Sequence, residues 1–302
     1  MLVCAVLFAA VALVPGHIFD PLNSVTASLS GLCIGLFGGH TAVSNDMISL
    51  NGFRVRIITE CTALYPVVLF SAFLLSVPAS LKSRLSGLAA GAAFLSSVNI
   101  LRIAAVTAVG ASRPVLFEIF HVYLGQVVMV IMVIAACLAW LHLIQPQRPH
   151  FNSVTFLIRF GVCSSLLFLA WFVFNVDYVR LIDDNIVRRL FSLKDFELEI
   201  PYGHMIYYQT FNLVTFVGLV MASGAKVLRQ KIRLVAAGLA IIVGMHILFR
   251  VCNILTTAFG MESAARLSDT IYMIGQYMVP VLLWLVFIRN DYRLKPEKSS
   301  SS

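Results

Sequence analysis

Long apolar stretches alternate with short polar connections along the whole chain. Each stretch is long enough to cross much or all of a hydrocarbon layer about 30 Å thick, at about 1.5 Å per residue in an α-helix. The pattern predicts an all-α polytopic membrane protein with about eight transmembrane helices, at Leu2–Phe19, Thr62–Ala79, Leu85–Val109, Phe117–Ile144, Val154–Val176, Thr210–Ala225, Leu234–Phe259 and Thr270–Ile288.

The charged residues indicate which connections lie in the cytoplasm. Residues 81–84, 145–159, 226–233 and 289–302 together hold twelve of the 22 Lys and Arg residues but only two of the fourteen acids. The positive-inside rule places these segments, and both termini, on the cytoplasmic side. The formal net charge of +8 is spread over short clusters, so membrane lipids are expected partners and nucleic acid is not.

The composition supports a membrane protein and argues against several kinds of functional site. The chain is 60% hydrophobic and only 12% charged, too few charges to cover a soluble protein of 302 residues. Its first apolar stretch has no Lys or Arg before it and no clear cleavage site, so we expect a retained span rather than a signal peptide. The six cysteines lack metal-ligand spacing, and no phosphate loop or dinucleotide motif is present. Neither a metal, a cofactor nor a disulfide framework is expected.

The two halves of the chain resemble each other. Each has one span, a polar outer segment (Asp20–Glu60 or Asp177–Gln209) and three further spans. The first outer segment ends in alternating residues around Asn51-Gly52, a favoured type I′ turn, and the second in FELEI and HMIYY around a Pro-Tyr-Gly turn. We therefore predict two parallel four-helix repeats, 1–145 and 146–302, each with a short extracytoplasmic β-hairpin.

Three residues carry the candidate chemistry. Cys61 lies where the first hairpin meets a helix, and a helix N-terminus stabilises a thiolate. Arg102 lies inside an apolar span, with Asn99 three residues earlier on the same face. His121 has Glu118 on its own face and suits a general base. Taken singly, each also has an ordinary structural interpretation as a buried thiol, an interfacial arginine or an interfacial histidine.

The three residues are expected at a similar depth in the membrane. At about 1.5 Å per residue, Cys61 lies about 31 Å from Lys82, Arg102 about 27 Å from Arg84, and His121 about 32 Å from His142. Consecutive helices thus place a thiol, a guanidinium and an imidazole at the outer interface. These are the groups that acyl transfer needs as nucleophile, oxyanion partner and base.

The order E-C-T-A-L, N-x-L-R and F-E-x-x-H on successive spans resembles the exosortase/archaeosortase family over residues 1–143. Ala63 departs from the glycine that many members carry. The resemblance implies a membrane cysteine transpeptidase or protease in the cell inner membrane, with its active site at the outer face. Cys61 would be the nucleophile, His121 the base and acid, and Arg102 the transition-state stabiliser or substrate positioner; Glu60, Asn99 and Glu118 would bind or orient the substrate. Expected partners are secreted proteins with a C-terminal motif, a transmembrane helix and a basic tail, with a lipid or polysaccharide as a possible acceptor.

The second half departs from this motif. Thr210 or a neighbour stands at the cysteine position, Arg250 persists near the arginine position, and Thr270 or Tyr272 replaces the histidine. We expect 146–302 to be a degenerate, non-catalytic copy, in which His246 and Arg250 at i and i+4 pair structurally. Two other classes stay open from the residues alone, a transporter of a small anion and a non-enzymatic membrane scaffold.

Overall fold

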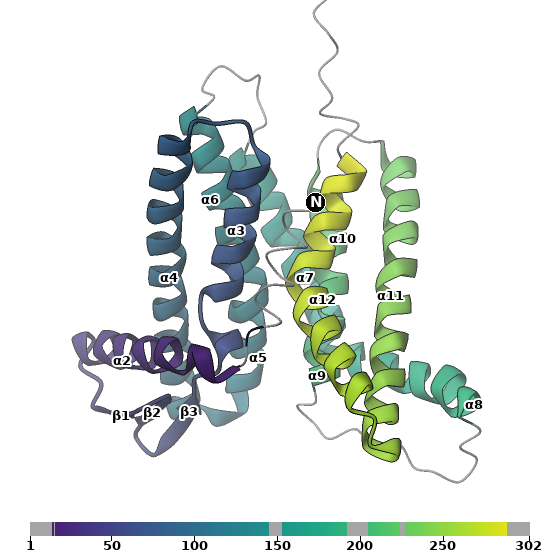
Figure 1. Ribbon diagram of the computed structural model, residues 1–302, viewed down its shortest axis with the longest axis horizontal. Helices are drawn as coiled ribbons and strands as arrows, with labels where there is room; N and C mark the ends of the chain where they lie inside the picture. The colour runs from purple at the N-terminus through teal and green to yellow at the C-terminus, as the bar shows by residue number, and fades with distance from the viewer. Residues whose placement is uncertain (1–13, 15, 145–152, 192–204, 224–226, 289–302) are drawn as a thin grey trace, which may run out of the picture. The chain divides into compact units, whose positions relative to one another are not determined.

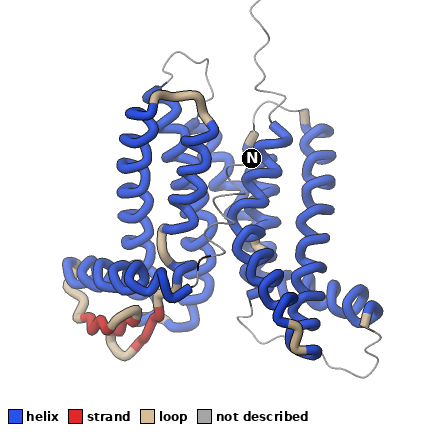
Figure 2. Tube along the Cα trace, viewed as in Figure 1, coloured by secondary structure: helices blue, strands red, loops and turns tan. Residues whose placement is uncertain are grey.

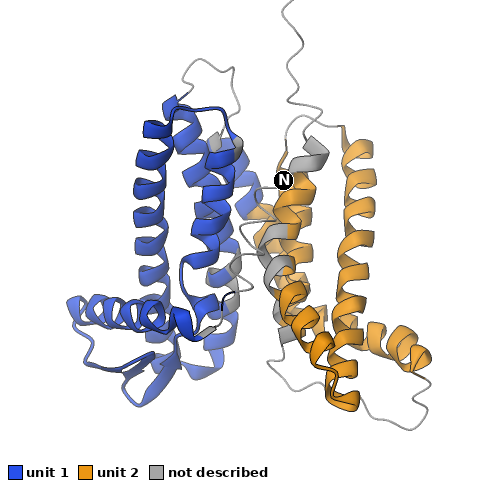
Figure 3. Ribbon diagram, viewed as in Figure 1, with its two compact units in different colours: residues 1–161 blue, residues 162–302 orange. Residues whose placement is uncertain are grey.

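The chain folds into two compact units, described here from a computed structural model. The structure describes residues 14, 16–144, 153–191, 205–223 and 227–288. Residues 1–161 form unit 1 and residues 162–302 form unit 2, so the boundary falls inside one long helix (Figure 3).

Unit 1 consists of a crosswise helix, a small sheet and a helical bundle (Figure 1). Its elements in order are η1 (Gly16–Phe19), α2 (Asp20–Leu36), β1 (Thr41–Ser44), β2 (Met47–Leu50), β3 (Phe53–Arg56), η2 (Thr59–Cys61), α3 (Leu64–Ser76), α4 (Leu81–Ser112), η3 (Pro114–Leu116), α5 (Phe117–Val122), the π-helical turn η4 (Tyr123–Val128) and α6 (Met129–Ile144).

Unit 2 is described as helices only (Figure 2). Helix α7 (Ser153–Ile182) enters it from unit 1, followed by the π-helical turn η5 (Asp183–Val187), α8 (Arg188–Leu190), α9 (Met205–Thr210), α10 (Asn212–Ala222), α11 (Leu228–Phe259) and α12 (Glu262–Ile288).

Among the residues that the structure describes, three helical stretches are long and apolar enough to cross a membrane: Leu81–Ser112, Val154–Leu190 and Leu228–Phe259. Shorter apolar helices, such as Met129–Ile144, accompany them. The protein is therefore a mostly helical, multi-pass membrane protein. Most of the expected first span lies outside the described residues, and the arrangement as eight spans in two repeats stays a prediction.

The sheet is larger than the hairpin expected from the sequence. The turn at Asn51-Gly52 is confirmed: both residues have positive φ, 51° and 84°, as a type I′ turn requires. Strands β2 and β3 pair around it, and β1 adds a third antiparallel strand through a second turn at Asn45, φ 51°. The first outer segment is thus a helix and a three-stranded sheet rather than a polar loop with a hairpin.

Helix α2 carries its apolar side chains outward. Its buried face is made of small, polar and a few apolar residues, among them Asn23, Ser30 and Gly31, and packs on α4 and the sheet. The exposed face holds a stripe at helical spacing: Leu22, Val25, Leu29, Leu32 and Leu36. Figure 1 shows α2 lying across α4, between the sheet and the bundle. An apolar stripe on a crosswise helix is typical of a helix in the membrane interface.

The prediction of a second hairpin is wrong for the part of it that the structure describes. Residues 205–208, expected as a strand, belong to helix α9, and FELEI lies outside the described residues. The outer segment from Asp177 also begins as helix, because α7 continues through η5 to Leu190. Alternating apolar residues over so short a run fit a buried helical turn as well as a strand.

The two units nevertheless repeat one packing arrangement. Helices α4 and α11 each have 32 residues and follow a shorter apolar helix, α3 or α10. In unit 1 Phe70 of α3 covers Gly91 of α4, and in unit 2 Phe216 of α10 covers Gly238 of α11. A side chain at either glycine would collide with the aromatic ring, so both contacts depend on glycine.

Candidate active site

Cys61 is presented by a tight turn between strand β3 and helix α3. The chain leaves the sheet with the Ile57 amide donating to the Asp46 carbonyl at 2.7 Å, and then forms the 3-10 turn Thr59–Cys61. The Thr62 hydroxyl donates to the Thr59 carbonyl at 2.7 Å and accepts from the Leu64 amide at 3.3 Å. This threonine joins the turn to the first helical residue, so Cys61 lies at a fixed position before the N-terminus of α3.

Two side chains of α4 hold the backbone of Cys61. Asn99 Nδ2 donates to the Cys61 carbonyl at 2.8 Å, and Arg102 Nη2 donates to the same oxygen at 3.0 Å. Asn99 is only 2% exposed, so this bond is shielded from water. The spacing of three residues puts both donors on one face of the helix, as expected from the sequence. The structure thus brings Cys61, Asn99 and Arg102 into direct contact.

The thiol of Cys61 lies in a mostly dry environment. Burial raises its pKa, whereas the charge of Arg102, a backbone hydrogen bond at Ile58 and a hydrogen bond from Arg102 act to lower it. The neighbouring Glu60 carboxylate adds to the increase. Burial prevails, so the resting group is the thiol, and a thiolate nucleophile would need a base and a nearby cation.

His121 is held by an aromatic stack on helix α5. Its ring stacks on Phe117 with centroids 5.4 Å apart, and Phe117 meets Phe53 of strand β3 edge-on at 5.1 Å. Gly110 of α4 leaves the room for both phenyl rings. His121 is near enough to Arg102 for the guanidinium charge to act on the imidazole. The sheet that leads to Cys61 therefore also braces His121, and Glu118 lies half-buried one turn earlier on α5.

Gly125 makes room for the guanidinium. It lies in the π-helical turn η4, and a Cβ at this position would lie 2.8 Å from Arg102 Nη1. On the same side chain, Arg102 Nε is buried without a hydrogen-bond partner. π-Helical turns are frequent at functional sites, where they shift side chains relative to a regular helix. The sequence motif did not single out Gly125, because its importance lies in a contact with a distant helix.

Replacing Gly125 with alanine is expected to displace Arg102 and lower any Cys61-dependent reaction by about 10- to 100-fold, because small misplacements of catalytic groups cost that much. The Cys61 thiol would lose part of the favourable charge, so its alkylation by iodoacetamide should require a higher pH than in the wild type. Gly161→Ala is the matched control, since the nearest atom to its added Cβ is Ile131 Cδ1 at 3.9 Å. Equal alkylation profiles for the two variants would contradict a role for Gly125 in placing Arg102.

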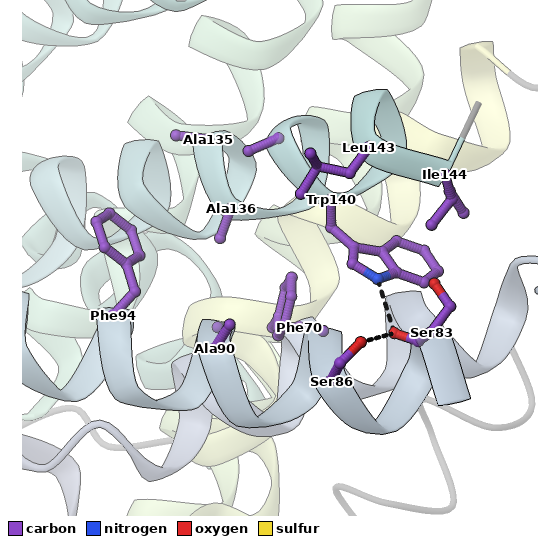
Figure 4. Close-up of a pocket in the computed structure, with 13 residues that line it drawn as sticks. Phe70, Ser83, Ser86, Ala90, Phe94, Ala135, Ala136, Trp140, Leu143 and Ile144 are labelled. Carbon is purple, nitrogen blue, oxygen red and sulfur yellow. Dashed lines mark hydrogen bonds between the residues drawn. The ribbon is translucent and has the colours of Figure 1, made fainter. Parts of the chain in front are cut away.

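An apolar groove in unit 1 is separate from these residues. It has a volume of about 570 Å³ and lies between α4 and α6, with Phe70 of α3 at its base (Figure 4). Trp140 closes one end and donates from Nε1 to the Ser83 carbonyl at 3.2 Å. None of the six candidate residues lines this groove, so it is not the site that the motif predicts.

Unit 2 places a different polar network on the helix that corresponds to α4. His246 Nε2 lies 3.0 Å from Asn212 Oδ1 and its Nδ1 lies 2.8 Å from the Tyr178 hydroxyl. Arg250 forms a two-point ion pair with Asp183, at 2.9 and 2.7 Å. The expected pairing of His246 with Arg250 is therefore wrong, since each is bound to a partner from another helix or turn. These partners were missed because they lie 34 to 68 residues away in sequence.

The other second-half positions make ordinary helix contacts. The Thr210 hydroxyl donates to the Tyr207 carbonyl at 2.9 Å and accepts from Trp171 Nε1 at 3.0 Å. The Thr270 hydroxyl donates to the Arg266 carbonyl one turn earlier at 2.8 Å. In the part of the chain that the structure describes, no three His, Cys, Asp or Glu side chains form a group able to hold a metal ion.

The fold and the site define a multi-pass membrane protein with a buried cysteine at a helix entrance, bound by an asparagine and an arginine. The family model described as transmembrane exosortase matches residues 1–141. This segment, which is just under half of the chain, contains all six candidate residues, and the resemblance seen in the sequence is confirmed over it. No curated protein and no solved structure matches the chain.

Proposed function

We propose that this protein is a membrane cysteine transpeptidase or protease that acts on exported proteins with a C-terminal sorting signal. The observation that carries the proposal is the double hydrogen bond from Asn99 and Arg102 to the carbonyl of Cys61. It fixes a thiol beside the cation of Arg102, whose charge also acts on His121, the histidine of the family motif. A purely structural cysteine has no need of such an arrangement.

The proposed reaction follows from these groups. His121 takes the proton of the Cys61 thiol, and the thiolate attacks the carbonyl carbon of the scissile peptide bond. Arg102 stabilises the negative oxygen that forms. The imidazolium returns the proton to the leaving amine, the C–N bond breaks, and a thioester remains on Cys61. Water, or a hydroxyl or amine of a lipid or polysaccharide acceptor, then attacks the thioester and restores the thiol.

The remaining candidate residues are proposed to position other groups rather than to react. Asn99 positions Cys61 through its carbonyl rather than contacting the substrate, and Glu60 and Glu118 orient the substrate or the histidine. We place the protein in the cell inner membrane with the site at the outer face, because the basic connections mark the opposite side as cytoplasmic.

We further propose that unit 2 is a duplicated copy of unit 1 that has lost the chemistry. The matched contacts of Phe70 with Gly91 and of Phe216 with Gly238 support the duplication. Its arginine is neutralised by Asp183, so it offers no free cation to a reacting group. A scaffolding role for the second repeat follows.

The test is to trap the thioester. The protein is co-expressed with reporters that carry a C-terminal motif, a transmembrane helix and a basic tail, and the membranes are analysed by denaturing electrophoresis with and without hydroxylamine. We expect a shortened reporter and an enzyme–reporter adduct that hydroxylamine cleaves. Shortening with no hydroxylamine-labile adduct, or no shortening with any of a series of tails, would overturn the proposal.

A further inference from the structure

Strand β3 forms one edge of the sheet, directly before the candidate nucleophile. The strand order is β1-β2-β3, so β2 has a neighbour on each side, and among the described residues β3 pairs with β2 alone. Edge strands present unpaired backbone N–H and C=O groups, which can bind an additional extended chain.

The register shows which residues direct these groups outward. Leu50 and Phe53 flank the two-residue turn and are hydrogen-bonded to each other in such a hairpin. Bonded and non-bonded pairs then alternate, so Val55 and Ile57 also bond toward β2, in agreement with the 2.7 Å bond from the Ile57 amide to Asp46. Arg54 and Arg56 therefore direct their amides and carbonyls to the open edge.

Exposed side chains flank this edge, which leads to Cys61. Arg54 is exposed, the Arg56 side chain is 71% exposed, and Ile58 is 46% exposed. Ile58 has an extended backbone and precedes the 3-10 turn that ends in Cys61. On the opposite face, Ile48, Leu50 and Ile57 share one buried cluster with Cys61, so the edge and the nucleophile form one rigid assembly.

We propose that the substrate segment before the scissile bond binds as a fourth strand along β3, running toward Cys61. This inference rests on the proposed function and adds the mode of recognition. Hydrogen bonds to Arg54 and Arg56 would supply sequence-independent affinity, and the exposed Ile58 side chain would select an apolar residue close to the cleavage point. At about 3.3 Å per residue, the edge from Arg54 to Ile58 measures about 13 Å and holds about five residues.

The experiment removes one outward N–H without changing the ladder to β2. The rate at which a tailed reporter is shortened is compared between Arg54→Pro and Arg54→Ala. Both variants lose the arginine side chain, but only the proline variant also loses the backbone N–H. Proline is tolerated on an edge strand where its N–H would face away from the sheet. We expect Arg54→Pro to shorten the reporter at least about tenfold more slowly than Arg54→Ala. The control is Val43→Pro, which removes an outward amide from the opposite edge on β1 and should leave the rate unchanged.

Two further measurements separate the outcomes. Alkylation of Cys61 at the wild-type rate in Arg54→Pro shows that the site has folded. Disulfide crosslinking of Arg54→Cys, in a Cys61→Ala chain without other cysteines, to single cysteines placed along the reporter should succeed at every second position, as the period of a strand requires. Equal rates for Arg54→Pro and Arg54→Ala, or crosslinks without that period, would overturn the β3 inference alone. Failure of the wild type to shorten any reporter would overturn the proposed function itself, and the inference with it.

Discussion

Replacement of Cys61 by alanine is expected to abolish shortening of a tailed reporter, with a loss of about 10⁴-fold or more. The reason is that the proposed intermediate is a thioester, which needs the Cys61 sulfur, and the two side chains bound to Cys61, Asn99 and Arg102, are not nucleophiles at neutral pH. The full-length reporter should accumulate in the membrane, and the rate is read from the ratio of the two bands.

Cys252→Ala is the matched control for this variant. Cys252 is also a free, buried cysteine, 3% exposed, but it belongs to the apolar cluster of unit 2. Its loss should leave the rate of shortening within about twofold of the wild type, since a buried cysteine normally acts as a small apolar residue. A Cys61→Ala protein that still shortens the reporter would exclude Cys61 as the nucleophile.

The sequence was most informative where local chemistry determines structure. The Asn51-Gly52 dipeptide predicts its turn because few residues adopt positive φ at low cost, and the turn fixes the pairing of β2 with β3. The spacing of Asn99 and Arg102 likewise predicts one helical face. That both side chains bind the carbonyl of Cys61 could not be predicted, because it depends on how α4 packs beside a turn 38 residues earlier.

The sequence analysis did not predict helix α2, because its apolar residues face outward and its polar residues face inward, the reverse of a helix in a soluble protein. Small and polar residues such as Ser30 and Gly31 face the protein, and leucines such as Leu29 face outward. A segment between a span and a hairpin was expected to be a polar loop. Its apolar stripe becomes interpretable once the structure shows α2 lying across the bundle, where lipid can cover the stripe.

In the second outer segment, the sequence failed to reveal a buried polar contact. Asp183 falls in the range expected as a polar outer segment, yet its side chain is only 4% exposed and is bound to Arg250. Neither residue reveals this in the sequence, because nothing in the apolar pattern marks the end of α7 as part of the core. The same contact explains why Arg250 resembles Arg102 in position but differs in chemistry.

Removing Asp183 is the change expected to cost the most stability. Asp183→Ala leaves the Arg250 guanidinium buried with no opposite charge, and breaking a buried ion pair from one side costs about 3–5 kcal/mol. The two-point geometry, at 2.9 and 2.7 Å, indicates a well-formed pair. We expect a clear fall in the free energy of unfolding, measured by equilibrium denaturation in mixed micelles.

The adjacent Asp184 supplies the control for this prediction. It pairs with Arg188 one turn along at 3.2 Å, but its side chain is 60% exposed, so Asp184→Ala should change the free energy of unfolding by about 0.5 kcal/mol or less. Replacing both partners of the buried pair, as Asp183→Leu with Arg250→Met, should recover most of the loss, because no unpaired charge then remains in the core. Equal losses for Asp183→Ala and Asp184→Ala would show that the buried pair contributes no more to stability than a surface one.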